Sequence, residues 1–176
     1  MPAPGSPEAR DLCALFHHSF AASAGEDEAR DVAALVEKLI AEDPDARRLF
    51  VATQDGTAKA AIVFSLMRFG DDPAEAWLLS PVAVAPDAQG QGIATALIRY
   101  GLDALRGAGA RMAVTYGDPG FYGRVGFVPV SVDHVPPPFR LSQPDGWQAQ
   151  ALEKPAPWPL PGPARCAAAF DDPALW

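Results

Sequence analysis

The chain has 176 residues, of which 49% are hydrophobic and 20% are charged, and its formal net charge at neutral pH is −8. This composition is typical of a folded globular protein and excludes a disordered chain. The negative charge, with no basic stripe in the sequence, argues against nucleic acid as a partner and would favour a cationic one, such as an amine or a basic peptide. The alternative is that the charge only keeps the protein in solution. We expect a single domain over residues 1–176.

Targeting and metal-binding signals are weak. No apolar run approaches the roughly 20 residues that a membrane span needs, and residues 1–6 lack the basic and then apolar pattern of a signal peptide. The sequence therefore predicts a cytoplasmic protein with no membrane partner. Cys13 and Cys166 belong to no CxxC pair, and His17, His18 and His134 lack the spacing of metal ligands, so we expect reduced thiols and no metal.

Two helices are predicted first. Ser6, Pro7 and Glu8 form a typical helix start, with a hydroxyl N-cap, a proline at the first helical position and an acid in the first turn. Apolar residues then recur at helical spacing at Leu12, Leu15, Phe16 and Phe20. The same period predicts a helix over residues 31–41, and we expect residues 24–28 to form a small acidic loop between the two helices.

Strands follow. Residues 49–53 and 60–67 flank Asp55-Gly56, a strong signal for a tight hairpin turn. A third strand is predicted over residues 76–85. Pro81 lies inside it and cannot donate a ladder hydrogen bond, which indicates a bulge or a locally unpaired edge.

The rest of the chain predicts a helix over residues 93–105 that Gly107 and Gly109 close, a strand over 111–116, a helical turn over 119–124, and strands over 127–132 and 147–152. The core should cover about residues 6–152. From about residue 153 to 176 the density of prolines excludes long helices and central strands. These elements predict a mixed α/β (α+β) sandwich. Its mainly antiparallel sheet is splayed near Pro81 and has helices on both faces.

The junction between the third strand and the following helix carries the clearest functional signal. A strand–loop–helix turn with small side chains aims unpaired N–H groups and the positive end of the helix dipole at one point, which suits a phosphate. A Walker loop is excluded because no Lys-Ser/Thr pair follows, and a dinucleotide fingerprint because Thr95 replaces its third glycine. An ordinary turn with helix-packing glycines remains the alternative. The residues concerned are Gln89, Gly90, Gln91, Gly92, Ile93 and Ala94.

A known family carries this pattern. Gln89-Gly-Gln-Gly92-Ile-Ala94, after Val84-Ala-Pro86, resembles the acetyl-CoA-binding motif of the GNAT superfamily of N-acetyltransferases. The block Gly117-Asp-Pro-Gly-Phe-Tyr-Gly-Arg-Val-Gly-Phe127 is similar to the second signature of this superfamily, in the form found in small bacterial members of the YhbS-like type. The resemblance implies a GNAT-like acyl-CoA N-acyltransferase fold, with acetyl-CoA as cosubstrate.

The resemblance also implies roles for single residues. The strand edge at Val82, Ala83 and Val84 would hold pantetheine, because an extended chain with two amides can pair with a strand edge. The loop from Gln89 to Thr95 would hold the pyrophosphate, and Asp118 is counted with the cofactor-binding residues. Tyr122 occupies the position of the general acid that protonates the leaving CoA thiolate. The alternative is that Tyr122 only packs under the cofactor. We expect the Val82 N–H to stabilise the oxyanion.

Two features depart from the family pattern. Ser80 stands where many relatives carry a glutamate base, so either a water chain or Glu26, Glu28 or Asp118 would take the proton. The first predicted helix starts by Ser6, so the usual N-terminal edge strand is either missing or lies before the recorded start. The expected reaction is direct transfer of acetyl to a primary amine of a small molecule or peptide.

The acceptor should approach from the acidic segments 24–30 and 69–73. The rival readings are a non-catalytic acyl-CoA-binding or sensing module and a transferase that uses a bulkier acyl-CoA. We also consider a homodimer formed through the tail.

Overall fold

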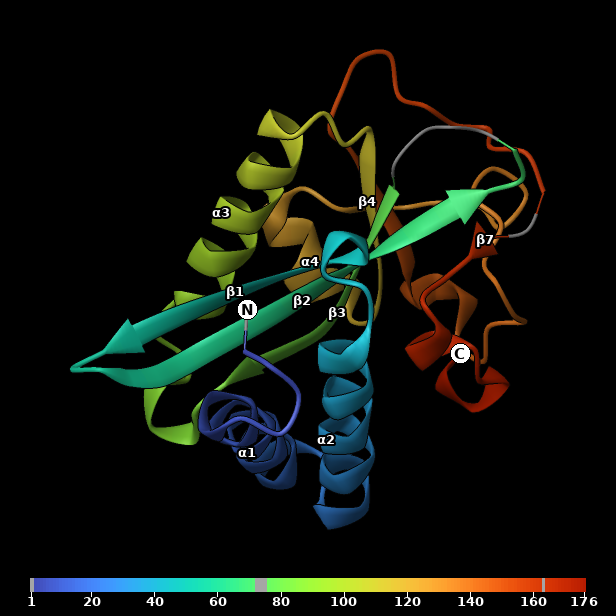
Figure 1. Cartoon of the computed structure of the whole chain (residues 1–176). Helices are drawn as coiled ribbons and strands as arrows, with labels where there is room; N and C mark the ends of the chain where they lie inside the picture. The colour runs from blue at the N-terminus through green and yellow to red at the C-terminus, as the bar shows by residue number, and fades with distance from the viewer. Residues whose placement is uncertain (1, 72–75, 163) are drawn as a thin grey trace. The chain divides into compact units, whose positions relative to one another are not determined.

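A computed structural model describes residues 2–71, 76–162 and 164–176 (Figure 1). Its α-helices are α1 (Pro7–Ser23), α2 (Glu26–Ala41), α3 (Ile93–Gly107) and α4 (Pro119–Tyr122). Its strands are β1 (Arg47–Gln54), β2 (Thr57–Phe69), β3 (Ala76–Val84), β4 (Met112–Tyr116), β5 (Val128–Pro129), β6 (Trp147–Ala151) and β7 (Ala164–Arg165). Short 3₁₀ turns join them at Pro44–Ala46, Pro86–Ala88, Gly123–Val125, Pro144–Gly146, Ala168–Phe170 and Pro173–Leu175.

The strands form one mixed sheet. Hydrogen-bonded neighbours follow the order β1-β2-β3-β4-β6-β5, and β7 pairs with β2. The pair β3–β4 is parallel, whereas β4–β6, β5–β6 and β2–β7 are antiparallel. A mainly antiparallel sheet with four α-helices in the described residues confirms the predicted fold class. None of the helices in these described residues is long and apolar enough to cross a bilayer.

The chain divides into two compact units. Unit 1 contains the residues up to Phe64 together with Pro81–Ile98, and unit 2 contains Ser65–Ser80 together with Arg99–Trp176. β2, β3 and α3 each have residues in both. The prediction of a single domain over the whole chain stays a prediction.

In unit 1, α1 and α2 pack against each other and lie on the same side of the β1–β2 hairpin (Figure 1). The N-cap prediction is confirmed, because Ser6 Oγ accepts a hydrogen bond from the Ala9 N–H at 3.1 Å. Each helix buries one apolar side, which contains Leu12, Leu15 and Phe16 in α1 and Val32, Leu35, Val36, Leu39 and Ile40 in α2.

The predicted acidic loop between these helices is wrong. α2 begins at Glu26, so only Ala24 and Gly25 connect it to α1. Gly25 has a φ of +99° at the N-cap position, a conformation that glycine adopts without strain. Glu26, Asp27 and Glu28 form the first turn of α2, where their charges interact favourably with the positive end of the helix dipole.

The hairpin prediction is confirmed. Asp55 and Gly56 form the turn between β1 and β2, with φ values of +51° and +78°. Two successive positive φ angles are those of the tight turn that matches the twist of paired strands.

The parallel ladder between β3 and β4 is short. It pairs Ala76, Trp77 and Leu78 with Met112, Ala113 and Val114. At the next position the Thr115 hydroxyl donates to the Leu79 carbonyl at 3.0 Å. The regular β3–β4 ladder therefore ends before Pro81, and the Thr115 side chain bonds to β3 in its place. This agrees with the disruption that the sequence predicts at Pro81.

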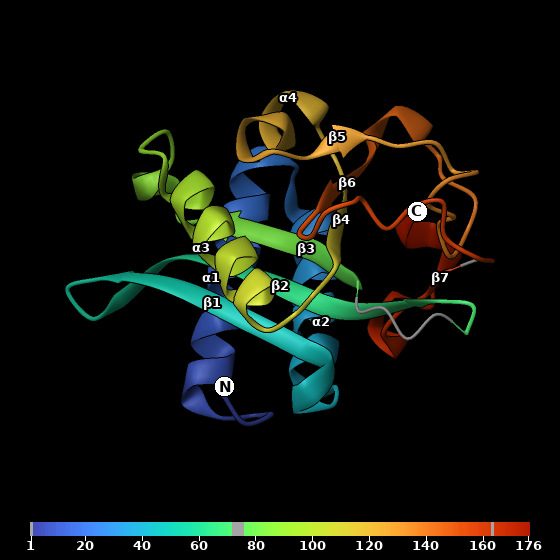
Figure 2. The ribbon, with the colours of Figure 1, turned by 90° about the horizontal axis from the view of Figure 1, so that it is seen from above.

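The predicted strand over residues 127–132 is wrong in length, since β5 comprises only Val128 and Pro129. Pro129 has no N–H with which to continue a ladder. Figure 2 shows β5, β6 and β4 side by side.

The proline-rich tail of unit 2 packs against the strands through its aromatic residues. Trp176 is 5% exposed, stacks on Tyr116 with ring centroids 6.3 Å apart, and meets Trp147 edge to face. Its carbonyl accepts from the Ser142 N–H at 2.7 Å. Trp176 is thus part of the core of unit 2.

We therefore expect Trp176→Ala to lower the free energy of unfolding by about 3–5 kcal/mol, because the substitution removes a buried aromatic ring. Leu175→Ala is the matched control: Leu175 is 38% exposed, and its loss should change stability by about 0.5 kcal/mol or less. Urea unfolding of both variants checks this. Equal losses would contradict a specific role for the Trp176 ring.

Candidate functional site

The glycine loop connects β3 to α3 within unit 1. Gly90 and Gly92 have φ values of +73° and +77°, and a Cβ added at either position would meet nothing within 4 Å. The backbone conformation, more than lack of space, therefore requires glycine here. Both residues are exposed, so the loop backbone is open to a ligand.

The first turn of α3 supplies free donors. The Ala96 N–H bonds to the Gly92 carbonyl at 3.0 Å, which is the first hydrogen bond of the helix. The N–H groups of Ile93, Ala94 and Thr95 come before it and have no acceptor within the helix. Together with the helix dipole, they make this end of α3 suitable for an anion.

Lys59 and Asp87 anchor the start of the loop. Lys59 Nζ lies 2.6 Å from Asp87 Oδ2, and the Asp87 carbonyl accepts from Gln91 Nε2 at 3.2 Å. Sequence analysis missed Lys59, because 28 residues separate it from Asp87 and no motif links the two. The sequence placed Lys59 near the Asp55-Gly56 turn, but it did not indicate that Lys59 lies beside the glycine loop.

The end of β3 has one edge that the sheet does not fill. The Ala85 N–H donates to the Lys59 carbonyl of β2 at 2.8 Å. Successive residues of a strand point their backbone groups to opposite sides, so the N–H and C=O of Val84 point away from β2. Val82, two residues earlier, has the same orientation, whereas Ala83 has the opposite one.

Two side chains form hydrogen bonds with the backbone N–H and C=O of Val84. Its N–H donates to Ser19 Oγ of α1 at 3.2 Å, and its carbonyl accepts from Gln89 Nε2 at 3.2 Å. The predicted strand edge is thus present but is not vacant. Sequence analysis missed Ser19, which stands among the apolar residues of a helix and belongs to no motif.

Tyr122, at the end of α4 in unit 2, is packed among aromatic rings. The ring centroids of Phe121 and Phe127 lie 5.0 and 5.9 Å from that of Tyr122, both in edge-to-face geometry. A Cβ added at Gly117 would lie 2.8 Å from Tyr122 Cε2, so the ring needs a glycine at this position. The second sequence motif therefore has a packing reason for its first glycine.

Burial raises the pKa of the Tyr122 phenol above its ordinary value of 10.0. The negative charge of Asp118 adds to this rise in pKa, and a hydrogen bond with the Thr115 side chain opposes it. The phenol therefore stays protonated at neutral pH and holds a proton that it can donate.

Asp118 caps α4. Its Oδ1 accepts from the Gly120 N–H at 2.8 Å, which is the ordinary work of an N-cap aspartate. The structure thus gives Asp118 a structural hydrogen bond, and its cofactor-binding role stays a prediction.

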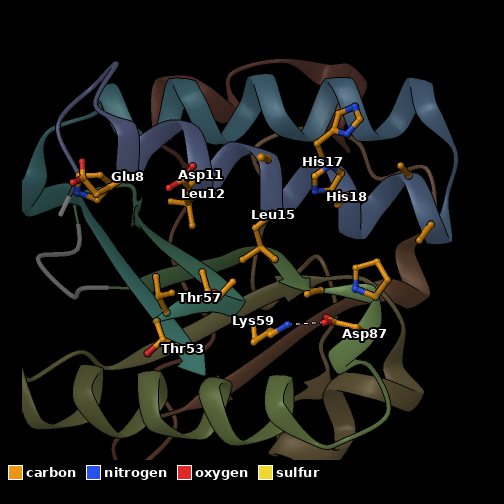
Figure 3. Close-up of a pocket in the computed structure, with 18 of the residues that line it drawn as sticks. Glu8, Asp11, Leu12, Leu15, His17, His18, Thr53, Thr57, Lys59 and Asp87 are labelled. Atoms are coloured by element: carbon orange, nitrogen blue, oxygen red, sulfur yellow. Dashed lines mark hydrogen bonds and ion pairs between the residues drawn. The ribbon is translucent and has the colours of Figure 1, made fainter. Parts of the chain in front are cut away.

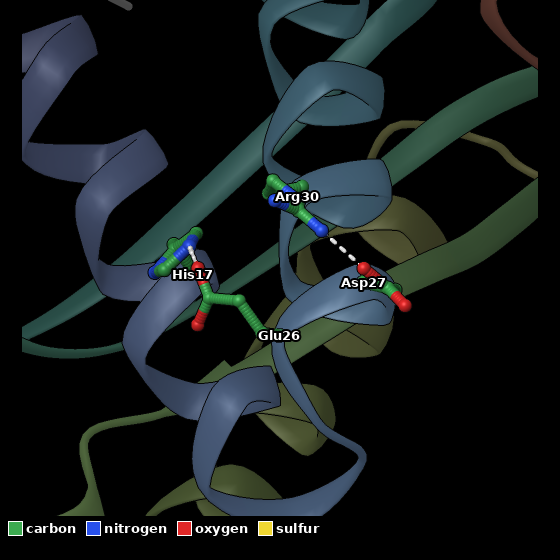
Figure 4. A network of polar contacts seen from close by, with 4 residues as sticks. All are labelled: His17, Glu26, Asp27 and Arg30. Atoms are coloured by element: carbon green, nitrogen blue, oxygen red, sulfur yellow. Dashed lines mark hydrogen bonds and ion pairs between the residues drawn. The ribbon is translucent and has the colours of Figure 1, made fainter.

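The expected substitutes for a glutamate base, Glu26, Glu28 and Asp118, lie on two helices: Glu26 and Glu28 in the first turn of α2, and Asp118 at the N-cap of α4. Ser80 is half-buried in β3, and Glu28 is exposed on α2. Glu26 Oε1 lies 3.0 Å from His17 Nε2 of α1, and Asp27 pairs with Arg30 (Figure 4). Of the predicted acceptor side, segment 24–30 lies in unit 1 and residues 69–71 lie in unit 2. Asp72 and Pro73 lie outside the described residues.

Unit 1 has a cavity of about 1150 Å³ between α1 and the β1–β2 hairpin (Figure 3). Apolar side chains line it from both elements, and the remaining lining includes four carboxylates, at Glu8, Asp11, Glu26 and Asp87. A second cavity, of about 720 Å³, lies in unit 2 between residues 116–119 and 142–146. Gly117 lines this cavity and also contacts Tyr122.

Neither cysteine forms a disulfide; Cys13 and Cys166 are half-buried thiols. The part of the chain that the structure describes has no group of three or more His, Cys, Asp or Glu side chains that could hold a metal ion.

The fold and the loop can now be compared with known proteins. The model of the acetyltransferase (GNAT) family matches residues 10–127, a segment that contains both sequence motifs. The chain belongs to this family. It is therefore an acetyltransferase of the GNAT type, and the resemblance drawn from the motifs is confirmed.

Similar proteins and solved structures belong to the same family. The chain is 34% identical over 133 residues to YjhQ, an uncharacterised N-acetyltransferase of Escherichia coli K12, and the match covers 72% of this chain and 73% of YjhQ. The structure resembles that of E. coli YhbS, a GNAT family N-acetyltransferase in complex with CoA, with a TM-score of 0.79, 27% identity, and coverage of 95% of this chain and 88% of that one. A GNAT family acetyltransferase from Brucella melitensis in complex with acetyl-CoA has a TM-score of 0.68 and 31% identity, and the match covers 96% of both chains.

The positive φ at Gly92 predicts that Gly92→Ala lowers the free energy of unfolding by about 1–2 kcal/mol, because a Cβ strains this conformation. Gly107→Ala, in the last turn of α3 with an ordinary φ, should instead raise stability by up to about 1 kcal/mol. Chemical unfolding of the two variants compares the same substitution in both settings. A loss of the same size at both positions would contradict the conformational argument.

Proposed function

We propose that this protein transfers an acetyl group from acetyl-CoA to a primary amine of a small molecule or peptide. The observation that carries the proposal is in unit 1, where the outward backbone edge of Val84 is followed directly by the open glycine loop and the free amides of α3. Acetyl-CoA has matching chemistry, since an extended diamide chain leads to a pyrophosphate. The complexes of the two similar proteins with CoA and acetyl-CoA support this choice.

The loop would bind the pyrophosphate through its backbone. The N–H groups from Gln89 to Thr95 and the positive end of α3 provide donors without requiring a lysine. Lys59 adds a nearby positive charge, which its pairing with Asp87 partly offsets. The C=O of one pantetheine amide and the N–H of the other would pair with the N–H and C=O of Val84 as a neighbouring strand would.

Direct attack by the amine nitrogen forms the new C–N bond and gives a tetrahedral oxyanion, which the Val82 N–H would stabilise. The C–S bond then breaks and leaves a thiolate, while the ammonium proton passes to water or to a carboxylate. The protonated phenol of Tyr122 is the proposed donor to the sulfur.

The acid strengths limit this last step. An ordinary thiol has a pKa of about 8.5 and a phenol one of about 10, so full proton transfer to a CoA thiolate in water would cost about 2 kcal/mol. Desolvation of the thiolate raises the pKa of the thiol in turn. Tyr122 would therefore stabilise the leaving sulfur by a hydrogen bond that becomes proton transfer as the negative charge grows.

A second candidate function follows from Ser80. With a hydroxyl in place of the usual glutamate, the protein would bind acyl-CoA as a sensor and release no CoA. A transferase for a bulkier acyl group is the variant within enzymes. Assays of CoA release with acetyl-CoA and longer acyl-CoAs, over a broad panel of amines, separate these cases.

We expect acetyl-CoA and CoA to raise the melting temperature. A ligand at 100 times its dissociation constant adds about 2.7 kcal/mol of stability. Thermal unfolding over a concentration series measures the shift. No shift with either compound would overturn the proposal.

Tyr122→Phe should lower kcat at least about tenfold with little change in the Kd of acetyl-CoA, because the substitution removes only the acid. Tyr100→Phe, at a residue that is 65% exposed on α3, is the matched control and should leave both values unchanged. Steady-state kinetics and calorimetry provide the readouts. An unchanged kcat in Tyr122→Phe would mean that Tyr122 only packs.

The pH dependence of the wild type follows from the raised pKa of Tyr122. The contribution of the phenol proton to kcat should be fully present below pH 10 or so and should be lost only as pH rises through the raised pKa. The ratio of wild-type to Tyr122→Phe rates should therefore stay constant between about pH 7 and about pH 9. A ratio that falls within this range would contradict the raised pKa.

A further inference from the structure

Ser19 places a buried hydroxyl on the backbone edge that the cosubstrate would use. It lies on α1, is 7% exposed, and accepts the Val84 N–H across 65 residues of sequence. Leu15 and Phe16, in the preceding turn, are buried and fix this face of the helix. The contact is therefore part of the packed structure of unit 1.

The orientation of this hydroxyl differs from that of a nearby serine on the same helix. Ser23 Oγ donates to the Ser19 carbonyl at 3.1 Å, which is the common local bond of a serine within a helix. Ser19 Oγ instead accepts a hydrogen bond from β3. The donor is the Val84 N–H, which faces away from β2. Gln89 occupies the matching acceptor, the Val84 carbonyl.

We propose that Ser19 is an internal competitor for the Val84 N–H, so that its hydroxyl must release this donor before a pantetheine carbonyl can bind there. The inference rests on the proposed function, because it assumes that Val84 pairs with pantetheine. In the free protein the hydroxyl accepts from a half-buried N–H that faces away from β2. When the ligand leaves, the same hydroxyl returns to Val84 and favours release.

The competition predicts the direction in which the affinity for CoA and acetyl-CoA changes when the Ser19 hydroxyl is removed. Binding exchanges one hydrogen bond of Val84 for another and leaves a largely buried hydroxyl without its donor. Removing the hydroxyl destabilises the free state and also removes the unpaired hydroxyl from the bound state. Ser19→Ala should therefore bind CoA and acetyl-CoA more tightly, by about three- to tenfold, which corresponds to one ordinary hydrogen bond.

The test compares three variants by isothermal titration with CoA and with acetyl-CoA. Ser19→Ala should lower both dissociation constants and also the melting temperature of the free protein. Ser23→Ala, which removes a hydroxyl one turn along the same helix, should stay within about twofold of the wild-type Kd. Ser19→Thr keeps the hydroxyl and should also keep the wild-type affinity.

Unchanged or weaker binding by Ser19→Ala would overturn the inference, as would equal tightening by Ser19→Thr. Amide hydrogen exchange of the wild type is an independent measurement: the Val84 N–H should be protected in the free protein as well as in the CoA complex. Rapid exchange in the free protein would also overturn it. If the wild type binds neither CoA nor acetyl-CoA, the proposed function fails instead, and the two failures are distinguishable.

Discussion

A strand must satisfy its backbone groups on both sides, and the end of β3 does so on one side without a neighbouring strand. Its ladder with β4 ends at Leu78, and further along the strand the Val84 groups bond to the side chains of Ser19 and Gln89. Side-chain bonds can be exchanged for ligand bonds without unfolding a sheet. The proposed cosubstrate site in unit 1 depends on this arrangement, in which two side chains bond to β3 where a neighbouring strand would otherwise do so.

The local features of the fold could be predicted from sequence because they depend on residues close together in the chain. Ser6 caps α1, Asp55-Gly56 forms the hairpin turn, and Gly90 and Gly92 have the positive φ angles of a special loop. The start of α2 was missed because acidic residues after a glycine suit both a loop and a first helical turn. Here the helix dipole and the packing of the apolar face favour the helix.

The contacts that complete the site could not be predicted in the same way. Ser19 with Val84 and Lys59 with Asp87 join residues that are 65 and 28 positions apart, and one sequence does not show such pairs. The rise in the pKa of Tyr122 likewise depends first on burial, which comes from packing and not from the motif. The motif identifies this tyrosine as a candidate acid, but only the packing determines how strongly it holds its proton.

Lys59 gives the hairpin turn an influence on a distant part of the chain. Its carbonyl accepts the Ala85 N–H and its ammonium group pairs with Asp87, so one residue of β2 holds both ends of the segment that leads into the glycine loop. A slip of one residue in the pairing of β2 with β3 would turn this side chain to the other face of the sheet. The geometry of the proposed phosphate site thus depends on the register of β2, a strand that belongs to no recognised motif.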